Sequence, residues 1–270
     1  MSAAPSPHEL LGAAVEFALA AGAILREGYG RAHRPERKGR IDLVTEYDRR
    51  SERLLLDAIA ARYPGHAVLA EESGASAATA GTPAVRWLID PLDGTTNFAH
   101  NYPFFCVSVA AEVAGTLAAG AVYDPVRDEL FASAAGGGAT LNGSPLSVSD
   151  IDRVEDALLV SGFPYDVREH PERSLPLFEA FLMRAQGLRR DGSAALNLCY
   201  LATGRFDGFW EGHLSPWDMA AGVLMVREAG GTVTDYAGGP FRLERPEILA
   251  SNGRIHEEMR TVLAGARAGR

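Results

Sequence analysis

The chain has 270 residues, a hydrophobic content of 47% and a formal net charge of −9 at pH 7. This length and composition allow one large or two small globular domains with a sizeable core. The excess of carboxylates argues against a general nucleic-acid or acidic-membrane binder, because phosphate groups are bound by clustered Lys and Arg. We therefore expect no direct nucleic-acid binding, and cations are the more suitable partners.

The cysteines and the N-terminal segment exclude further classes of protein. Cys106 and Cys199 lie far apart and lack the spacing of a zinc site or a disulfide framework. The first 25 residues lack a basic region and carry Glu9 and Glu16 within their apolar run, unlike a signal peptide. No apolar run free of charged residues reaches the roughly 20 residues of a membrane span. We expect a cytoplasmic protein that does not bind membranes.

The chain begins with a helix and a basic segment. Apolar residues recur at steps of three and four between Leu10 and Leu25, which predicts an amphipathic helix that ends near residues 28–30. The segment 31–41 is basic, contains Pro and Gly and has no apolar periodicity. It predicts a mobile loop, either solvated or facing a phosphate group.

A second helix and a series of strands follow. The helix is predicted from about Thr45 to Tyr63, and Thr45 and Asp48 have the spacing of a capping box. Short apolar runs separated by turn residues then predict strands at 67–70, 85–89, 105–113, 117–124 and 129–135.

The second half mixes helices and strands. A helix is predicted to start at Ser215, a good N-cap followed by Pro216, and to end at Gly230. With no repeat and no long linker, the pattern predicts an α/β or α+β layered fold, a single domain with lobes of about 1–150 and 151–270. The other predicted elements are strands at 157–161, 206–210, 232–235 and 248–251, and helices at about 171–186, 193–203 and from 254 onward.

Acidic residues follow two of the predicted strands. Glu71 comes after the strand 67–70, and Asp90 comes after the strand 85–89. Pro91 has no N–H for strand pairing, so we expect the strand to stop there and turn. Asp90 and Asp93 would then converge on one point, although Asp-Pro and Asp-Gly are also common turn pairs.

Together these carboxylates indicate a cation site. Glu71, Asp90 and Asp93 would raise one another's pKa if they were adjacent, unless a cation neutralised them. Oxygen ligands without His or Cys point to Mg²⁺ or a similar ion. Gly94 and Thr95 then suit a phosphate seat, because a turn or helix that begins there directs free backbone N–H groups toward an anion.

Asp218 is a fourth carboxylate candidate, three residues after Ser215. An acidic residue in a first helical turn is also favoured by capping and by the helix dipole, so the local pattern leaves both interpretations open. Glu211, judged from its neighbours alone, is a charge at the end of a strand.

Two segments resemble the inositol monophosphatase family of Mg²⁺-dependent, lithium-sensitive phosphatases. They are DPLDGTTNF (90–98) and PWDMAAGVLMVREAGG (216–231). The resemblance implies a layered αβαβα sandwich, usually a homodimer, and hydrolysis of a small-molecule phosphate monoester with two or three Mg²⁺ ions per active site. Further matches occur in family order at 38–48, 71–73, 162–166, 192–211 and 250–255, so nearly the whole chain is covered.

The resemblance assigns roles residue by residue. It makes Glu71, Asp90, Asp93 and Asp218 metal ligands, with Leu92 offering its backbone carbonyl, and it gives Asp48 and Thr95 the activation of a water that Glu71 helps to deprotonate. It places Lys38 near the phosphate and the weakly held metals. The implied substrate contacts are Gly94, Thr95, Gly192, Ser193, Ala194, Glu211 and Asp218.

The substrate is less closely defined by the sequence. Relatives hydrolyse fructose 1,6-bisphosphate, histidinol phosphate, NADP or adenosine 3',5'-bisphosphate with the same metal cluster. Residues 95–98, TTNF, resemble those of inositol monophosphatases, so we expect cleavage of inositol-1-phosphate to inositol and phosphate by a metal-activated water. Some bacterial relatives are instead non-catalytic partners of the transcription and antitermination machinery. Arg189 and Arg190 resemble that bacterial form, but the sequence contains no intact partner-binding motif.

Overall fold

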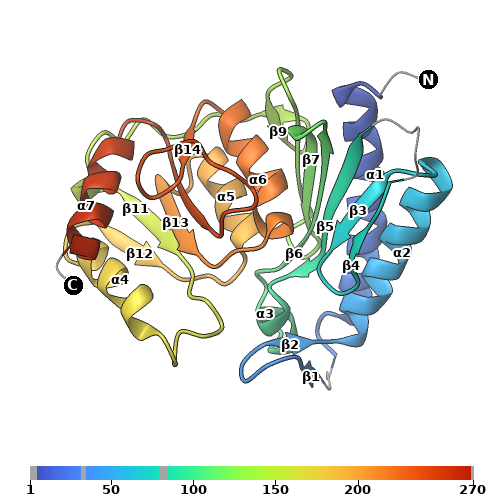
Figure 1. The fold of residues 1–270 in the computed structure, drawn as a ribbon, viewed down its shortest axis with the longest axis horizontal. Coiled ribbons are helices and arrows are strands. Elements are labelled where there is room, and N and C mark those ends of the chain that lie inside the picture. Colours follow the sequence, from blue (N-terminus) through green and yellow to red (C-terminus); the bar gives the residue numbers. More distant parts are fainter. Residues whose placement is uncertain (1–4, 32–34, 79–83, 269–270) are drawn as a thin grey trace.

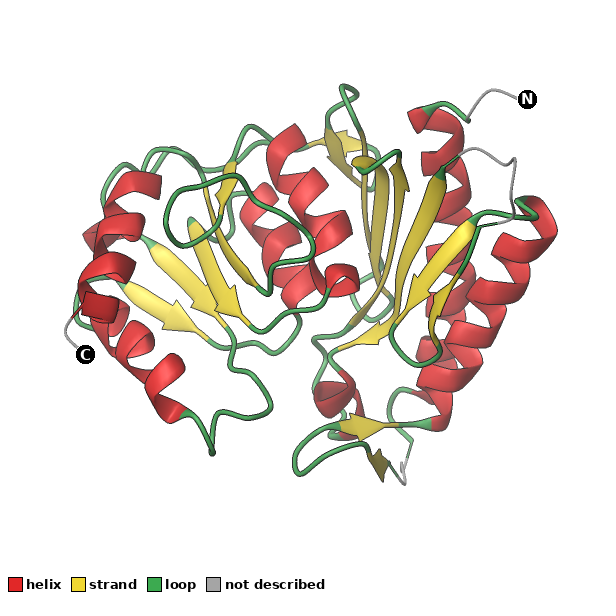
Figure 2. Ribbon diagram, viewed as in Figure 1, coloured by secondary structure: helices red, strands yellow, loops and turns green. Residues whose placement is uncertain are grey.

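The computed structural model describes residues 5–31, 35–78 and 84–268. Its elements form five layers in the order helix, sheet, helix, sheet, helix (Figure 1). Colouring by secondary structure shows two separate sheets with a pair of helices between them (Figure 2). The predicted α+β layered sandwich is therefore confirmed, whereas the division into two lobes near residue 150 stays a prediction.

The larger sheet has eight strands in the order β10-β9-β8-β7-β6-β5-β3-β4. All neighbouring pairs are antiparallel except β3 and β5, which run parallel. The carboxyl ends of β3 and β5 therefore meet at the same edge. The strands are β3 (Ala67–Ala70), β4 (Gly74–Ser76), β5 (Val85–Asp93), β6 (Cys106–Val113), β7 (Thr116–Asp124), β8 (Glu129–Ala134), β9 (Ala139–Leu141) and β10 (Ser144–Pro145).

Helices α1 (Pro7–Gly28) and α2 (Glu46–Arg62) cover the outer face of this sheet. α1 is long and apolar enough to cross a bilayer by length and composition, yet nearly half of its apolar stretch is buried in the protein. Its buried stripe includes Leu10, Phe17 and Leu25, at the predicted helical spacing. α2 begins with the predicted capping box of Thr45 and Asp48. The first helix is thus confirmed as amphipathic, and its apolar face packs on β6 and β7.

Helices α5 (Ala194–Ala202) and α6 (Pro216–Glu228) form the layer between the sheets. Residues 219–226 of α6 are all buried, because the helix touches β5, β6 and β7 on one side and β14 and β15 on the other. Two glycines permit this approach. A Cβ on Gly222 would lie 2.5 Å from Leu198 Cβ, and one on Gly120 would lie 3.0 Å from Ala221 Cα.

The smaller sheet has five strands in the order β12-β11-β13-β15-β14. β12, β11 and β13 run parallel, and β15 is antiparallel to both of its neighbours. Helices α4 (Leu175–Leu182) and α7 (His256–Ala268) lie on its outer side. The strands are β11 (Leu158–Ser161), β12 (Gly187–Arg189), β13 (Gly208–Gly212), β14 (Thr232–Thr234) and β15 (Glu247–Ser251).

The basic segment 31–41 differs from the predicted irregular loop. Residues 32–34 lie outside the described part of the chain, but β1 (Glu36–Arg37) pairs with β2 (Leu43–Val44) as a short antiparallel hairpin. Arg49 of α2 donates to both carboxylate oxygens of Glu36, at 2.8 and 2.6 Å. Side-chain ion pairs, which apolar periodicity does not report, hold this hairpin beside α2.

The strand prediction at Pro91 was wrong, because β5 continues through it to Asp93. The register with β6 shifts between Asp90 and Asp93, so the missing N–H falls where the ladder is irregular. Ser51 of α2 donates its hydroxyl hydrogen to the Pro91 carbonyl at 2.8 Å. The irregularity, rather than the end of the strand, brings the two aspartates to the same edge.

The helix predicted at 171–186 was also too long. Pro171–Arg173 form a 3-10 turn (η2), and α4 covers only Leu175–Leu182. Pro176 explains the break, because proline is accepted in the first turn of a helix but not in its interior. The strands β4, β9, β10 and β12 and the 3-10 turn η1 (Val154–Asp156) were not predicted, because they are short. Helix α3 (Thr95–Ala99) begins where a turn or helix was expected.

Candidate active site

A cavity of about 350 Å³ opens between the end of β5 and the loops of the second half. Every site residue named from the sequence lines this cavity except Asp48, which is buried behind Thr95. These residues come from the hairpin β1–β2, from β5 and α3, and from the starts of α5 and α6. The structure thus brings together, in one place, side chains separated by up to 180 residues in the sequence.

Glu71 follows β3, and Asp90 lies in the last part of the neighbouring parallel strand β5. Asp90 is only 2% exposed, and its Oδ1 accepts a hydrogen bond from the Leu92 N–H at 3.0 Å. Burial raises the pKa of Asp90 well above its usual range, and the nearby Glu71 carboxylate adds to this. Burial also raises the pKa of Glu71 to about 7, although the charge of Lys38 opposes it. The pair carries the mutual repulsion that the sequence predicted.

Asp93 connects the two halves of the molecule. Its Oδ2 accepts hydrogen bonds from the Ser193 hydroxyl at 2.6 Å and from the Ala195 N–H at 2.7 Å. Ser193 is the N-cap of α5, so Asp93 lies at the positive end of that helix. Burial raises the pKa of Asp93 to about 6, even though these hydrogen bonds favour the ionised form. Its orientation is fixed by groups 100 residues away.

Asp218 reaches the cavity from the first turn of α6. Its Oδ2 accepts a hydrogen bond from the Ser215 N–H at 2.8 Å, as in a capping box. Burial and the charge of Asp93 raise the pKa of Asp218 well above its usual range. Both interpretations of Asp218 are therefore correct. One carboxylate oxygen caps the helix, and the residue also lines the cavity.

Asp48 and Thr95 form a buried polar pair. Thr95 Oγ1 lies 2.9 Å from Asp48 Oδ1 and 3.1 Å from the Leu92 carbonyl, and its single hydrogen serves one of them at a time. Asp48 Oδ2 accepts hydrogen bonds from the N–H and the hydroxyl of Thr45, at 2.8 and 2.6 Å. Burial raises the pKa of Asp48 despite these bonds. The Thr95 hydroxyl is thereby held at the floor of the cavity.

Gly94 occupies a position that only glycine fits. Its φ is +96°, and a Cβ added there would lie 2.9 Å from the Phe104 carbonyl oxygen. It is the N-cap of α3, so the backbone of Gly94 and Thr95 faces the cavity where that helix begins. This arrangement matches the predicted phosphate seat in its geometry.

Lys38 lies on the acidic cluster. Its Nζ donates to Glu71 Oε1 at 3.0 Å and also pairs with Glu72. The hairpin β1–β2 carries this ammonium group to the cavity, which agrees with the predicted position of a loop lysine near the site. The Lys38 ammonium group therefore offsets part of the repulsion among these carboxylates.

A further part of the cavity wall comes from β13 and the start of α5. It holds Gly192, Ser193, Ala194 and Glu211, as predicted. Burial raises the pKa of Glu211 to about 8, while the charge of Arg190 opposes this. No hydrogen bond reaches the Glu211 carboxyl group from the described residues. Sequence reasoning did not identify Asp42, Phe163, Pro164, Tyr165, His213, Leu214 or Trp217 as lining the cavity.

The donor set fits a hard divalent cation. Glu71, Asp90, Asp93 and Asp218 offer carboxylates and Leu92 offers a carbonyl, so the donors are all oxygen, which Mg²⁺ prefers. Burial is the first cause of their raised pKa values, and a bound cation would favour the ionised form of these carboxylates. Within the described residues, no three His, Cys, Asp or Glu side chains are already arranged as around a bound ion. The chemistry fits, and binding requires the side chains to draw closer.

A comparison with known proteins defines the class. A model of the inositol monophosphatase family matches residues 6–267, so the chain belongs to this family, which is generally metal-dependent. It is a phosphate-monoester hydrolase.

Individual relatives agree with this classification. An inositol-1-monophosphatase of Synechocystis sp. is 47% identical over 263 residues, 96% of this chain and 91% of that protein. Nus factor SuhB of Vibrio cholerae is 40% identical over 249 residues, 92% of each chain. The solved structure of the inositol monophosphatase from Anabaena matches with a TM-score of 0.86 at 44% identity and covers 96% of each chain.

Proposed function

We propose that this protein hydrolyses inositol-1-phosphate to inositol and phosphate in a Mg²⁺-dependent reaction. One observation carries the proposal: a single cavity joins the carboxylates of β5 and α6 to a second wall that contains Glu211 and the start of α5. The first wall suits metal and phosphate, and the second suits the hydroxyl groups of a polyol. Family membership and the Synechocystis relative support the same assignment.

The metal ligands are assigned from the predicted set. Glu71, Asp90 and the Leu92 carbonyl would hold one ion, and Asp90, Asp93 and Asp218 would hold a second; a third would be held more weakly near Lys38. When bound, the ions lower the pKa of a coordinated water and neutralise charge on the phosphate and the leaving oxygen. The choice of Mg²⁺ rests on the all-oxygen donor set.

The chain's own groups position the reactants. The Thr95 hydroxyl can donate to Asp48, which leaves its oxygen free to accept a hydrogen from the attacking water. Glu71, which lines the cavity beside Asp90, takes the proton that the attacking water loses. The backbone N–H groups of Gly94 and Thr95 donate to the phosphate oxygens.

The substrate's hydroxyl groups meet the opposite wall. Glu211 accepts hydrogen bonds from the polyol, and its lack of a hydrogen-bond partner among the described residues leaves the carboxyl group available. Gly192, Ser193 and Ala194 line the same wall, and Asp218 lies between the metal and the substrate positions. Lys38 supplies positive charge near the phosphate.

The test is a panel of kcat/KM values with Mg²⁺ on inositol-1-phosphate, fructose 1,6-bisphosphate, histidinol phosphate, adenosine 3',5'-bisphosphate and NADP. We expect inositol-1-phosphate to rank first, and EDTA or lithium to suppress phosphate release. If inositol-1-phosphate ranks well below another compound, the substrate assignment is wrong and one of the alternative phosphates takes its place.

A second function is carried by the similarity to the Vibrio protein named Nus factor SuhB. Under this alternative the chain would be a partner of the transcription and antitermination machinery without using its catalytic groups. Co-purification with RNA polymerase or antitermination factors, unchanged by Asp93→Asn, would support it. A homodimer, a cytoplasmic location and the absence of direct nucleic-acid binding also stay predictions, which light scattering, fractionation and a DNA or RNA binding assay test.

A further inference from the structure

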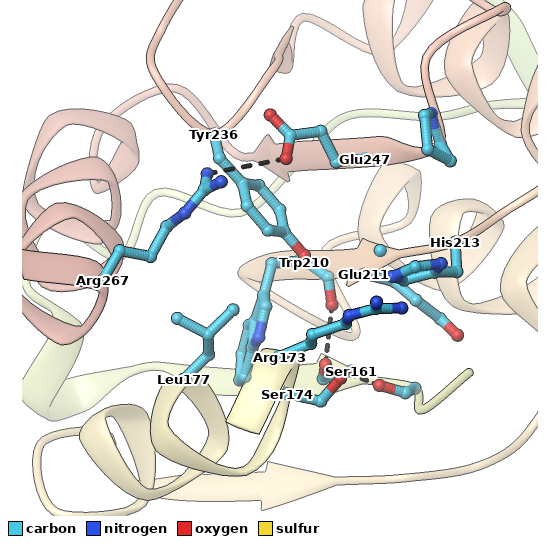
Figure 3. Close-up of a pocket in the computed structure, with 13 residues that line it drawn as sticks. Ser161, Arg173, Ser174, Leu177, Trp210, Glu211, His213, Tyr236, Glu247 and Arg267 are labelled. Atoms are coloured by element: carbon cyan, nitrogen blue, oxygen red, sulfur yellow. Dashed lines mark hydrogen bonds and ion pairs between the residues drawn. The ribbon is translucent and has the colours of Figure 1, made fainter. Parts of the chain in front are cut away.

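A second cavity adjoins the active site on the other side of Glu211. It has a volume of about 210 Å³, and we call it the distal pocket, lined chiefly by Arg173, Ser174, Leu177, Trp210, Tyr236 and Arg267 (Figure 3). It lies where β11 and β13 end, beside the start of α4 and the C-terminal part of α7. The mechanism proposed above uses none of these six residues.

The two cavities share part of their walls. Gly162, Glu211, Gly212 and His213 line both of them. The Glu211 carboxyl group packs directly on Gly162, since a Cβ added there would lie 2.0 Å from Glu211 Oε1. His213 is exposed and has a left-handed φ of +67°, uncommon for a residue other than glycine. A ligand in the active site that extends past Gly212 and His213 therefore reaches the distal pocket.

Tyr236, a largely buried residue, lines the distal pocket with a hydroxyl group that has no partner among the described residues. Tyr236 is only 7% exposed, and no hydrogen bond joins its hydroxyl group to the described residues. In Figure 3 the Tyr236 ring and the Arg173 side chain extend toward the middle of the pocket from opposite sides. A hydroxyl group that faces an open pocket without a partner in the protein can both donate to and accept from a ligand, so its position suits a polar ligand.

The polar groups of the pocket suit hydroxyl groups better than an anion. Arg173 and Arg267 are donors, and each already pairs with a carboxylate, Asp166 at 3.0 Å and Glu247 at 3.5 Å. Glu247 and Glu211 place acceptors in the same wall, and the Glu247 carboxylate, which already pairs with Arg267, would repel an anion. A hydroxyl group both donates and accepts, so a polyhydroxylated ring can use both kinds of partner.

The remaining wall is apolar and the volume is small. Trp210 and Leu177 are buried, and the Trp210 ring stacks on Phe181 with centroids 4.0 Å apart, which fixes its position. Drug-sized ligands occupy cavities of about 300–1,000 Å³, so a pocket of about 210 Å³ suits a single ring.

We propose that the distal pocket binds a second polyhydroxylated ring, and that this protein hydrolyses phosphate monoesters of two-ring glycosides more efficiently than their one-ring counterparts. The phosphate and the first ring occupy the active site, and the second ring contacts Tyr236, Arg173 and Trp210. This inference rests on the proposed function, because it uses the same phosphatase site and adds a subsite to it.

The experiment compares matched pairs of substrates that differ by one ring. Values of kcat/KM with Mg²⁺ are measured for trehalose 6-phosphate against glucose 6-phosphate and for maltose 1-phosphate against glucose 1-phosphate, with inositol-1-phosphate as reference. We expect a two-ring to one-ring ratio of about ten or more for at least one pair. The ratio should fall about threefold to tenfold in Tyr236→Phe, which removes only the unpartnered hydroxyl group.

Two further variants keep the outcome unambiguous. Ser174→Tyr places a larger side chain in the wall of the distal pocket and should abolish the two-ring preference, even if Tyr236→Phe folds poorly. Tyr63→Phe is the matched control, because Tyr63 lines neither cavity. Activity on inositol-1-phosphate should stay within about twofold of wild type in all three variants, since no residue of the catalytic machinery is changed.

The outcomes separate the two proposals. A wild-type protein that hydrolyses inositol-1-phosphate but has ratios of one or less for both pairs overturns the distal subsite. So does a ratio above one that neither Tyr236→Phe nor Ser174→Tyr lowers. A protein that ranks inositol-1-phosphate low yet keeps a two-ring preference sensitive to these variants instead overturns the proposed substrate and retains the subsite.

Discussion

The ends of β5 and β13 face each other across the active site, and they are built differently. At the end of β5, Asp90 and Asp93 accept hydrogen bonds from the protein itself, and buried Asp48 does so behind them. At the end of β13, the Glu211 carboxyl group packs on Gly162 and receives no hydrogen bond from the described residues. The acids at the end of β5 thus have hydrogen-bond partners within the protein, whereas the Glu211 carboxyl group is left for a ligand to satisfy.

The largest effect should come from the β5 end, through Asp93→Asn. The amide keeps an acceptor for Ser193 but loses the negative charge of a metal ligand, so we expect kcat to fall about 10³-fold or more. Thermal unfolding followed by circular dichroism should show little loss of stability. A variant with wild-type kcat would remove Asp93 from the metal site.

The second change removes the buried hydroxyl group at the same end. Thr95→Ala breaks the contact with Asp48 and frees the attacking water from its acceptor, so we expect kcat to fall about 100-fold. Thr96→Ala is the matched control, since Thr96 is exposed one position further along α3. Steady-state kinetics that showed equal losses in both variants would contradict the role of the Thr95 hydroxyl group.

The third change tests how firmly the β5 end is fixed. Gly94→Ala combines a φ of +96° with a contact of 2.9 Å to Phe104, and we expect a loss of about 2–3 kcal/mol in the free energy of unfolding. Gly30→Ala, with a φ of +84° and no atom within 4 Å of the added Cβ, should lose about 1 kcal/mol. Urea unfolding measures both values, and similar losses would show that the crowding at Gly94 has no effect.

The smallest effect concerns charge at the two ends and appears in the absence of metal. Burial raises the pKa of Glu71 to about 7, of Asp93 to about 6 and of Glu211 to about 8. At these three sites the folded protein binds more protons than the unfolded chain, so their contribution to stability is full below about pH 4 and is lost as the pH rises toward 8. Each such proton contributes at most about 1.4 kcal/mol per pH unit.

Glu211→Gln separates the β13 contribution from that of the acidic cluster. In EDTA the variant should lose less stability than wild type between pH 5 and pH 8, and the difference should grow with pH. Saturating Mg²⁺ should stabilise both proteins, more at pH 8 than at pH 5, because metal ligands must be ionised. Parallel pH profiles for the two proteins in EDTA would show that Glu211 does not retain a proton in the folded state.

Local patterns predicted the parts of this protein that depend on nearby residues. The spacing of Leu10 to Leu25 gave the correct helix, and the capping pairs of α2 and α6 lie where the sequence indicated. Acidic residues next to predicted strands pointed to the site, with Glu71 after β3 and Asp90 in the last part of β5. The resemblance carried by residues 90–98 and 216–231 indicated the family that the comparison then established.

The errors lie where distant contacts override the local signal. Pro91 does not end β5, because the irregular pairing with β6 needs no N–H at that position. The segment 36–44 forms a hairpin that pairs with Arg49 of α2 and, through Lys38, with Glu71 and Glu72, which are 33 and 34 residues away from Lys38. Patterns of apolar residues carry no information on such ion pairs.

The sequence by itself determined the layered fold, the family and the acidic residues of the site, because these follow from periodicity, capping and motifs within short segments. Only the tertiary structure decided that Ser193 and Ala195 hold Asp93, that Glu211 lies against Gly162, and that a second pocket opens behind it. The distal pocket takes its walls from β11, β13, α4, the residues after β14, and α7. Its shape exists only after those segments pack, so no local pattern could predict it.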